Sequence, residues 1–247
     1  MAEFFAKEFN GPPFELLSLQ HIAALAMVAL VGLSLILLMK PATASQKKQV
    51  RLVLAIALLL NEIIWHLWNW SIDTWNLATM LPLHLCSILV WLSALMLLTR
   101  NQTIYEFGFL VGIAGALQGL LTPDLGSYSF PHFRYFQTFL SHGLLVITPL
   151  YMTFVEGKRP TWRSVGKVLL FGNLYALLVF GINFISGGNY LFIARKPETA
   201  SLLDLFPPWP IYLIILELLL VLVVFLFYSP FAISDARKKK SAIKSDS

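Results

Sequence analysis

The chain has 247 residues, of which 57% are hydrophobic and only 13% are charged. That composition excludes a soluble globular protein, because a soluble fold cannot cover so much apolar surface. The formal net charge of +5 does not indicate nucleic-acid binding. The basic residues concentrate in short segments between apolar runs, which is the pattern that controls membrane topology, and no RNA- or DNA-binding motif is present. We therefore expect an integral membrane protein with no nucleic-acid partner.

Seven apolar runs predict an all-α, polytopic membrane protein with seven transmembrane helices. Each run approaches the roughly 20 residues that cross a bilayer, and none is apolar on one side only. Glycines recur every three or four residues in the fourth run, and within a membrane this spacing favours close helix packing. The predicted helices are 19–39, 50–70, 78–98, 104–121, 135–155, 165–186 and 211–228, and the glycines are Gly108, Gly112, Gly115 and Gly119.

The basic residues also predict the orientation of the chain in the membrane. Of the 18 basic residues, 14 lie after the first, third, fifth and seventh spans. By the positive-inside rule these segments are cytoplasmic, so the N-terminus is outside and the C-terminus is cytoplasmic. The expected organisation is an extracytoplasmic segment over 1–18, a seven-helix transmembrane domain over 19–228 and a basic cytoplasmic tail over 229–247. Because residues 1–18 lack a basic n-region, we expect the first span to stay in the mature protein as an anchor.

Ionisable and amide groups within the spans gather in the outer half of the predicted membrane domain. Such groups are costly in lipid and usually face a bundle interior or a wet cavity. We therefore predict a polar cavity that opens outward. Its candidate members are Asn61, Glu62, His66, His84, Cys86, Gln118, His142, Asn183 and Glu217. The alternative for Glu62 and His66, which share one helix face at i,i+4 spacing, is a pair whose members simply satisfy each other.

Cys86 is the single cysteine of the chain, so it is either a small core residue or a reactive thiol. At 1.5 Å rise per residue it lies roughly 12 Å below the outer boundary, and His142 lies at nearly the same depth. An imidazole that contacts a thiol takes its proton and creates a nucleophile. Matching depth is necessary for that contact and does not demonstrate it. His84 is a poorer partner, because two residues along a helix point to roughly opposite faces.

A zinc site is a weaker alternative for the same histidines and the cysteine. It requires at least three of these side chains to converge, and the opposite-face relation of His84 and Cys86 argues against that. We expect no metal and no cofactor.

Six short motifs resemble the bacterial YwaF family of multi-pass membrane proteins, which is related to the eukaryotic transmembrane protein 164 family. The resemblance runs from about the second span to the seventh. Eukaryotic members are described as cysteine-dependent acyltransferases that move fatty acyl chains between phospholipids. The motifs are Leu81-Pro82-Leu83-His84-Leu85-Cys86, Thr122-Pro123-Asp124, Ser141-His142-Gly143, Gly188-Asn189-Tyr190, Lys196-Pro197 and Trp209-Pro210.

The resemblance implies a phospholipid acyltransferase of the bacterial plasma membrane, with Cys86 as the acyl acceptor and His142 as its base. A thiol below the outer surface agrees with this chemistry, because phospholipid ester groups lie near the boundary of head groups and hydrocarbon. Asn61, Gln118 or backbone amides near Pro82 are candidates for stabilising the oxyanion. Arg134, Arg195 and Lys196, on long outer connections, are candidates for holding the lipid phosphate.

The alternative function is a non-enzymatic seven-helix sensor or carrier that binds a lipid or a small ligand. Such a protein requires the outer polar groups but not contact between Cys86 and His142.

Overall fold

The computed structural model describes residues 3–197 and 202–245, and this part of the chain is helical with no strand. A π-helical turn, η2, joins α4 to α5, so the two form one interrupted rod. The helices are α1 (Leu19–Met39), α2 (Ala44–Ser71), α3 (Leu85–Thr99), α4 (Gln102–Phe107), η2 (Gly108–Gly112), α5 (Ile113–Leu121), α6 (Phe133–Phe154), α7 (Trp162–Ser186) and α8 (Ile211–Ser245). Short 3₁₀ turns occur at Glu3–Phe5 (η1), Tyr190–Phe192 (η3) and Leu202–Leu205 (η4).

The prediction of an all-helical membrane protein is confirmed. Five described helices are long and apolar enough to cross a bilayer, namely α1, α2, the α4–α5 rod, α7 and α8. The helices α3 and α6 occupy the third and fifth predicted spans. With 15 residues, α3 is shorter than the roughly 20 that a crossing requires. The seven crossings and their orientation therefore stay predictions.

The third predicted helix, 78–98, begins later than expected, at Leu85. The apolar run continues through the preceding residues, but Pro82 has no N–H and disfavours helical geometry at Leu81. The N–H of Leu83 instead donates to the carbonyl of Leu81 at 2.7 Å in a tight turn. This shift places Cys86 in the first turn of α3 rather than two turns inside a helix.

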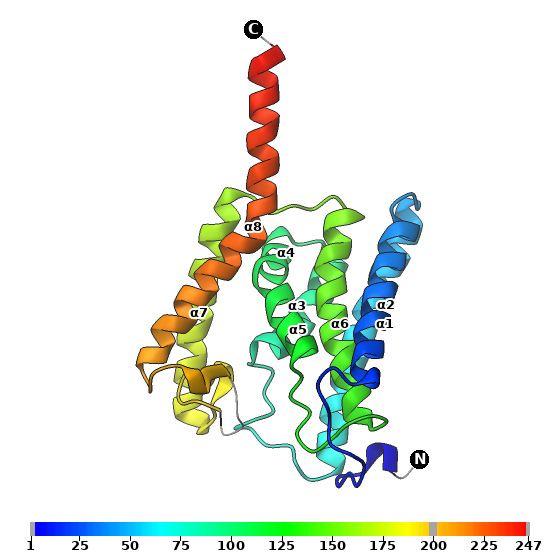
Figure 1. Ribbon diagram of the computed structural model, residues 1–247, viewed down its shortest axis with the longest axis vertical. Helices are drawn as coiled ribbons and strands as arrows, with labels where there is room; N and C mark the ends of the chain where they lie inside the picture. The colour runs from blue at the N-terminus through cyan, green and yellow to red at the C-terminus, as the bar shows by residue number, and fades with distance from the viewer. Residues whose placement is uncertain (1–2, 198–201, 246–247) are drawn as a thin grey trace.

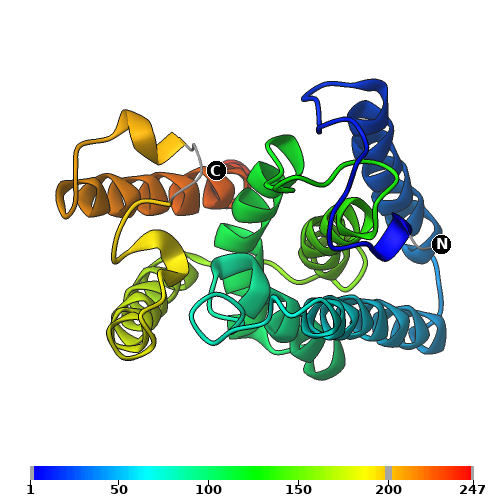
Figure 2. The same cartoon turned by 90° about the horizontal axis from the view of Figure 1, so that it is seen from below.

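The helices stand side by side, with the N-terminus at one end and α8 extending beyond the others at the opposite end (Figure 1). Seen along the helices, α7 and α8 lie to one side of the group formed by α1, α2, α3, α5 and α6 (Figure 2). The main core lies where α2, α3, the α4–α5 rod and α6 meet, with Leu58, Met96, Leu97, Leu110, Tyr105 and Met152 fully buried.

Ion pairs tie the helices together at the end of the bundle opposite the N-terminus. Glu156, just after α6, pairs with Arg51 of α2 and, at 2.9 Å, with Arg100 at the end of α3. Lys167 of α7 pairs with Glu106 of α4 at 2.5 Å. By the positive-inside rule, this is the end that the sequence predicts to be cytoplasmic.

Candidate functional site

Cys86 is the second residue of α3 and lies in the first helical turn. The first hydrogen bond of that helix runs from the N–H of Ile88 to the carbonyl of His84 at 3.0 Å. His84, the N-cap residue, makes no side-chain capping bond. No acceptor in the described part of the chain is recorded for the N–H groups of Leu85, Cys86 and Ser87. These three donors, together with the positive end of the helix dipole, favour negative charge beside the thiol.

The thiol faces the glycine-lined side of α5. A Cβ atom added to Gly115 would lie 3.9 Å from Cys86 Sγ and 3.0 Å from a methyl group of Leu85. About one helical turn before Gly115, a Cβ on Gly112 would lie 3.0 Å from Leu89 of α3. The predicted close packing at these glycines is confirmed, and Gly108 is the exception, because its added Cβ would meet no atom within 4 Å.

His142 of α6 packs on the same face of α5, at Gly119. A Cβ on Gly119 would lie 2.4 Å from Cδ2 of the imidazole and 2.5 Å from Nε2. Gly115 and Gly119 are four residues apart, so they are neighbours on one helix face. The thiol and the imidazole are therefore within roughly 12 Å of each other. No hydrogen bond between them is recorded among the described residues, so the two side chains are neighbours rather than a bonded pair.

The hydrogen bond of His142 determines which ring nitrogen is free. Nδ1 lies 2.9 Å from the carbonyl oxygen of Thr138. A carbonyl only accepts, so Nδ1 carries the proton and donates, and Nε2 is the unprotonated nitrogen of the neutral ring. That nitrogen is the one directed at Gly119 and the α5 face. The imidazole is thus presented in the tautomer that a base requires.

Glu62 and His66 form a pair of their own on α2. His66 Nε2 lies 3.5 Å from Oε1 of Glu62, whose side chain is 5% exposed. The indole N–H of Trp75 donates to His66 Nδ1 at 3.1 Å. Because Nδ1 accepts, the proton of the neutral ring is on Nε2, toward the carboxylate. The pair binds Trp75 of the segment that leads to α3, and Glu62 and His66 are each other's partners.

Arg134 lies two turns before His142 on the same face of α6. Its guanidinium donates to Oε1 of Gln137 at 2.6 Å and to the carbonyl of Asp124 at 3.2 Å, and it lies 4.2 Å above the ring of Trp65. Its donors therefore already have protein partners at the start of α6.

Tyr190, fully buried, joins the loop between α7 and α8 to the segment before α3. Its hydroxyl donates to the carbonyl of Leu77 at 2.6 Å and accepts from the N–H of Leu81 at 2.9 Å. The amide of Asn183 bonds to both backbone groups of Tyr190, at 2.8 and 2.9 Å. The N–H of Leu191 donates to His84 Nδ1 at 3.4 Å. Asn183 and His84 therefore position backbone and do not face the thiol.

Replacing Tyr190 by Phe removes the hydroxyl that bridges two backbone groups before α3. We expect the free energy of unfolding to fall by about 1–3 kcal/mol, because buried partners lose a hydrogen bond. We also expect maleimide to label Cys86 faster, since the start of α3 is less firmly held. Tyr228→Phe is the matched control, because Tyr228 is buried and makes no recorded hydrogen bond in the described part. Equal labelling rates in wild type and Tyr190→Phe would contradict this role.

The other predicted residues lie apart from the thiol. Asn173 of α7 donates to Glu217 of α8 at 3.0 Å, so Glu217 bonds to a neighbouring helix. Lys196 Nζ donates to the carbonyl of Phe206 at 2.7 Å. The predicted polar residues thus bond to separate partners, and the shared outward cavity stays a prediction. Gln118 and Arg195 are exposed, and Asn61 donates to the carbonyl of Gln137 at 3.3 Å. Within the described ranges, no three His, Cys, Asp or Glu residues lie close enough to hold a metal ion.

The sequence model of the TMEM164 family matches residues 16–228. The chain belongs to the TMEM164 family. The match covers the helices that carry Cys86 and His142 and agrees with a multi-pass membrane protein. The eukaryotic half of the predicted resemblance is thus confirmed at family level, and assignment to the bacterial branch stays a prediction. No curated protein and no solved structure matches the chain significantly.

Two buried histidines of this TMEM164-family chain are absent from the predicted set. His132 Nε2 donates to the carbonyl of Ala6 at 3.0 Å, and its ring stacks on Tyr128. Burial lowers the pKa of His132, so its ring is neutral and Nδ1 accepts from the N–H of Arg134 at 3.1 Å. His21 likewise donates to the carbonyl of Leu120 at 2.9 Å. His132 holds the N-terminal segment and His21 joins α1 to α5; their partners lie about 100 residues or more away, so no local pattern indicates them.

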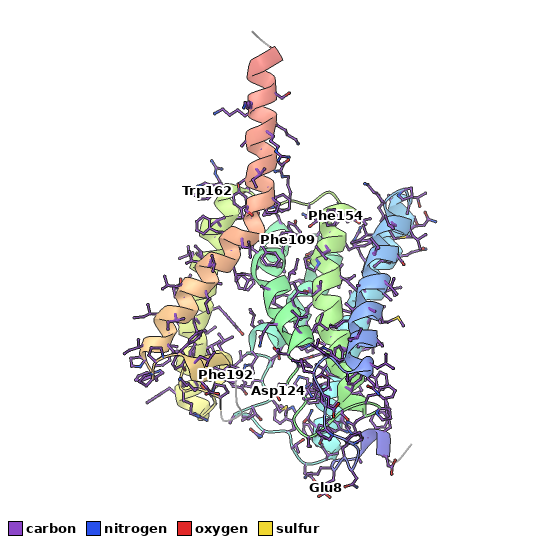
Figure 3. The ribbon with its side chains drawn as sticks, viewed as in Figure 1. Glu8, Phe109, Asp124, Phe154, Trp162 and Phe192 are labelled. Atoms are coloured by element: carbon purple, nitrogen blue, oxygen red, sulfur yellow. The ribbon has the colours of Figure 1, made fainter. Side chains whose placement is uncertain are left out.

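The end of the molecule that carries the thiol is the end of the N-terminus. Asp124 and Phe192 lie at the same end as Glu8, whereas Phe154 and Trp162 lie at the opposite end (Figure 3). The loop containing Asp124 precedes α6, and η3 with Phe192 packs on His84 at the start of α3. The two long connections therefore gather around the end at which α3 begins.

Proposed function

We propose that the protein is an integral membrane lipid acyltransferase or transacylase that uses Cys86 as nucleophile and His142 as base. One observation carries the proposal: the thiol lies in the first turn of α3, beside three free N–H groups, and faces the α5 glycine surface on which His142 packs. Helix N-termini lower the cost of a thiolate and bind oxyanions. Membership in the TMEM164 family is consistent with a membrane acyltransferase-like role.

The first half of the reaction transfers an acyl chain to the protein. His142 Nε2 takes the thiol proton, and Cys86 Sγ attacks the ester carbonyl of a phospholipid. The tetrahedral intermediate collapses with cleavage of the ester C–O bond, and the proton passes from His142 to the leaving alkoxide. The products are an acyl thioester on Cys86 and a lysophospholipid. In this scheme, rotation of the Cys86 side chain or substrate-induced closure of the helices brings Sγ to Nε2, while His142 keeps its bond to Thr138.

The second half of the reaction releases the chain to an acceptor. His142 Nε2 removes the proton from the hydroxyl of a second lysolipid, whose oxygen attacks the thioester carbonyl. The C–S bond breaks, the thiolate takes the proton back from His142, and the free thiol is restored. The scheme needs no oxidant, metal or nucleotide, because the acyl group passes from ester to thioester and back to ester without a change of oxidation state.

The N–H groups of residues 85–87 are the best oxyanion donors in this scheme. They belong to the same helical turn as Cys86, and backbone donors that are already fixed need no reorganisation. The Asn61 amide already donates to the carbonyl of Gln137, and Gln118 is exposed, so both fit that role less well. For the lipid phosphate, the exposed Arg195 is better placed than Arg134 or Lys196, whose donors bond to protein oxygens. The predicted orientation directs the site to the outer leaflet of the plasma membrane.

An acyl-labelling experiment tests the proposal. The protein is reconstituted in vesicles that contain a phospholipid with an alkyne-tagged acyl chain, and a tag that hydroxylamine removes is measured on the protein. Wild type is expected to carry the tag, and Cys86→Ala is expected to carry none. His142→Ala is expected to slow tagging by about 10²–10⁴-fold, the usual contribution of a general base.

Ser93→Ala is the matched control for this experiment. Ser93 is a small, buried residue on α3, two turns beyond Cys86, and its substitution is expected to leave tagging unchanged. Cys86→Ala that folds normally and still exchanges acyl chains at the wild-type rate would refute the covalent mechanism and favour the sensor or carrier alternative.

A further inference from the structure

An apolar groove of about 540 Å³ runs between α1 and α6. Its walls extend from Leu19 to Val31 on α1 and from Tyr135 to Ile147 on α6. None of the residues predicted for the Cys86 site lines it. The groove therefore requires an explanation separate from acyl transfer.

The length of the groove matches one leaflet of a bilayer. Each wall covers thirteen residues of helix, and the twelve rises between the first and the last correspond to about 18 Å. The hydrocarbon core is about 30 Å thick, so one leaflet contributes roughly 15 Å. A helix from another protein would need a groove along the whole span. A single acyl chain, entering from one surface and ending near the bilayer centre, fits these dimensions.

The contact between α1 and α6 closes both the floor and the inner end of the groove. A Cβ on Gly143 would lie 2.9 Å from Val28, so the two helices touch closely along the floor. At the inner end, a Cβ on Gly32 would lie 3.0 Å from Ile147. Near the outer end, the hydroxyl of Tyr135 donates to the carbonyl of Gln20 at 2.7 Å. The groove is thus closed at its floor and at its inner end, while exposed side chains such as Met27 and Leu140 border it along its open side.

A smaller polar pocket of about 150 Å³ adjoins the outer mouth of the groove and shares Gln20, Phe130 and Tyr135 with it. Of the residues recorded as lining this pocket, Glu15 contributes a negative charge and none contributes a positive one. The rings of Phe130, Tyr135 and Phe14 also line it. A carboxylate among aromatic rings attracts an ammonium group by charge and by cation–π interaction.

We propose that this continuous surface binds one phospholipid with an ammonium head group, whose acyl chain occupies the groove and whose ammonium lies at Glu15. The site is distinct from that of the proposed acyl transfer, because neither Cys86 nor His142 lines the groove. The bound lipid fills the gap between α1 and the rest of the bundle and thereby holds α1 against α6.

Lipid retention measured by native mass spectrometry tests the proposal. The delipidated protein is mixed with equal amounts of phosphatidylethanolamine and phosphatidylglycerol of the same chain length. Wild type is expected to retain one ethanolamine lipid. Ala23→Trp, which places a ring in the groove from an exposed position, is expected to reduce retention by roughly tenfold. Ala29→Trp is the matched control, because Ala29 is exposed on α1 and does not line the groove.

Two further variants separate the head-group site from the proposed chemistry. Glu15→Gln is expected to abolish the preference for ethanolamine over glycerol lipid, whereas Glu8→Gln, which changes an exposed carboxylate outside the pocket, is expected to keep it. Cys86→Ala is expected to retain the lipid fully. A lipid with a photoreactive group in its acyl chain is expected to label wild-type residues 19–31 and 135–147.

Four results would overturn the proposal. The first is equal lipid retention by Ala23→Trp and Ala29→Trp. The second is photolabelling spread evenly over the exposed helix faces of the wild type, a measurement that needs no variant to fold. The third is a change of oligomeric state in Ala23→Trp with unaltered lipid retention, which would make the groove a protein interface. The fourth is loss of acyl tagging at Cys86 in the Ala23→Trp variant that no longer retains the lipid, which would refute a separate site.

Discussion

Replacing Glu156 by Gln is expected to lower the free energy of unfolding by about 3–5 kcal/mol, the usual cost of removing one partner from a buried ion pair. The Glu156 side chain is 5% exposed and faces Arg51 with one carboxylate oxygen and Arg100 with the other. Without the carboxylate charge, the guanidinium of Arg51, which is 12% exposed, stays in the protein with no counter-charge.

The large effect arises because Glu156 joins three elements that are distant in the chain. Arg51 also donates through Nε to the carbonyl of Leu97 at 3.1 Å, so the same guanidinium holds α2 against the end of α3. Glu156 itself follows α6 directly. A disturbance here loosens α2, α3 and α6 together, and these helices build the main core.

Thermal unfolding of the purified protein in nanodiscs measures the effect. The matched control is Asp235→Asn, because Asp235 forms a single ion pair with Arg159 at 2.7 Å and is 52% exposed. Exposed pairs contribute about 0–1 kcal/mol, so the control is expected to unfold near the wild-type temperature. Similar losses in the two variants would show that burial of the Glu156 pair has no special importance.

Sequence patterns predict where helices occur more reliably than where they begin. The apolar run of the first span predicts 19–39, and α1 has these bounds. The third run predicts a helix that begins too early, because the sequence remains apolar through residues that belong to a loop. Tyr190, more than 100 residues away, satisfies the backbone of that loop, and no local signal reveals such a partner. The start of α3 therefore follows from tertiary contacts.

The candidate site shows the same division between local and tertiary information. Helical rise predicts equal depths for Cys86 and His142 from a helix that begins at residue 78, whereas α3 begins at Leu85. Depth also says nothing about direction around a helix. The glycines of the fourth run supply that direction, because Gly115 and Gly119 mark the face to which both side chains turn. The groove between α1 and α6 has no counterpart in the sequence, since it depends on the spacing between two helices.

Substituting Gly119 with Ala is expected to reduce the proposed acyl transfer by about 10²-fold, because a displacement near 1 Å at a reacting group has that cost. The added Cβ would lie 2.5 Å from Nε2 of His142, closer than a carbon atom can approach. The imidazole cannot yield without losing its 2.9 Å bond to Thr138. Alanine favours a helix interior over glycine by about 0.5–1 kcal/mol, so helix formation in α5 itself is not expected to suffer.

The rate of alkyne-tag transfer to Cys86 measures this effect of Gly119→Ala, and Gly181→Ala is the matched control. Gly181 lies inside α7, and a Cβ there would meet no atom within 4 Å. Both variants make the same chemical change in a membrane helix, but only one disturbs an imidazole. The control is expected to transfer at the wild-type rate. A Gly119→Ala protein with equally fast transfer would show that the imidazole packed against α5 is not the base, and the proton of the thiol would then require another acceptor.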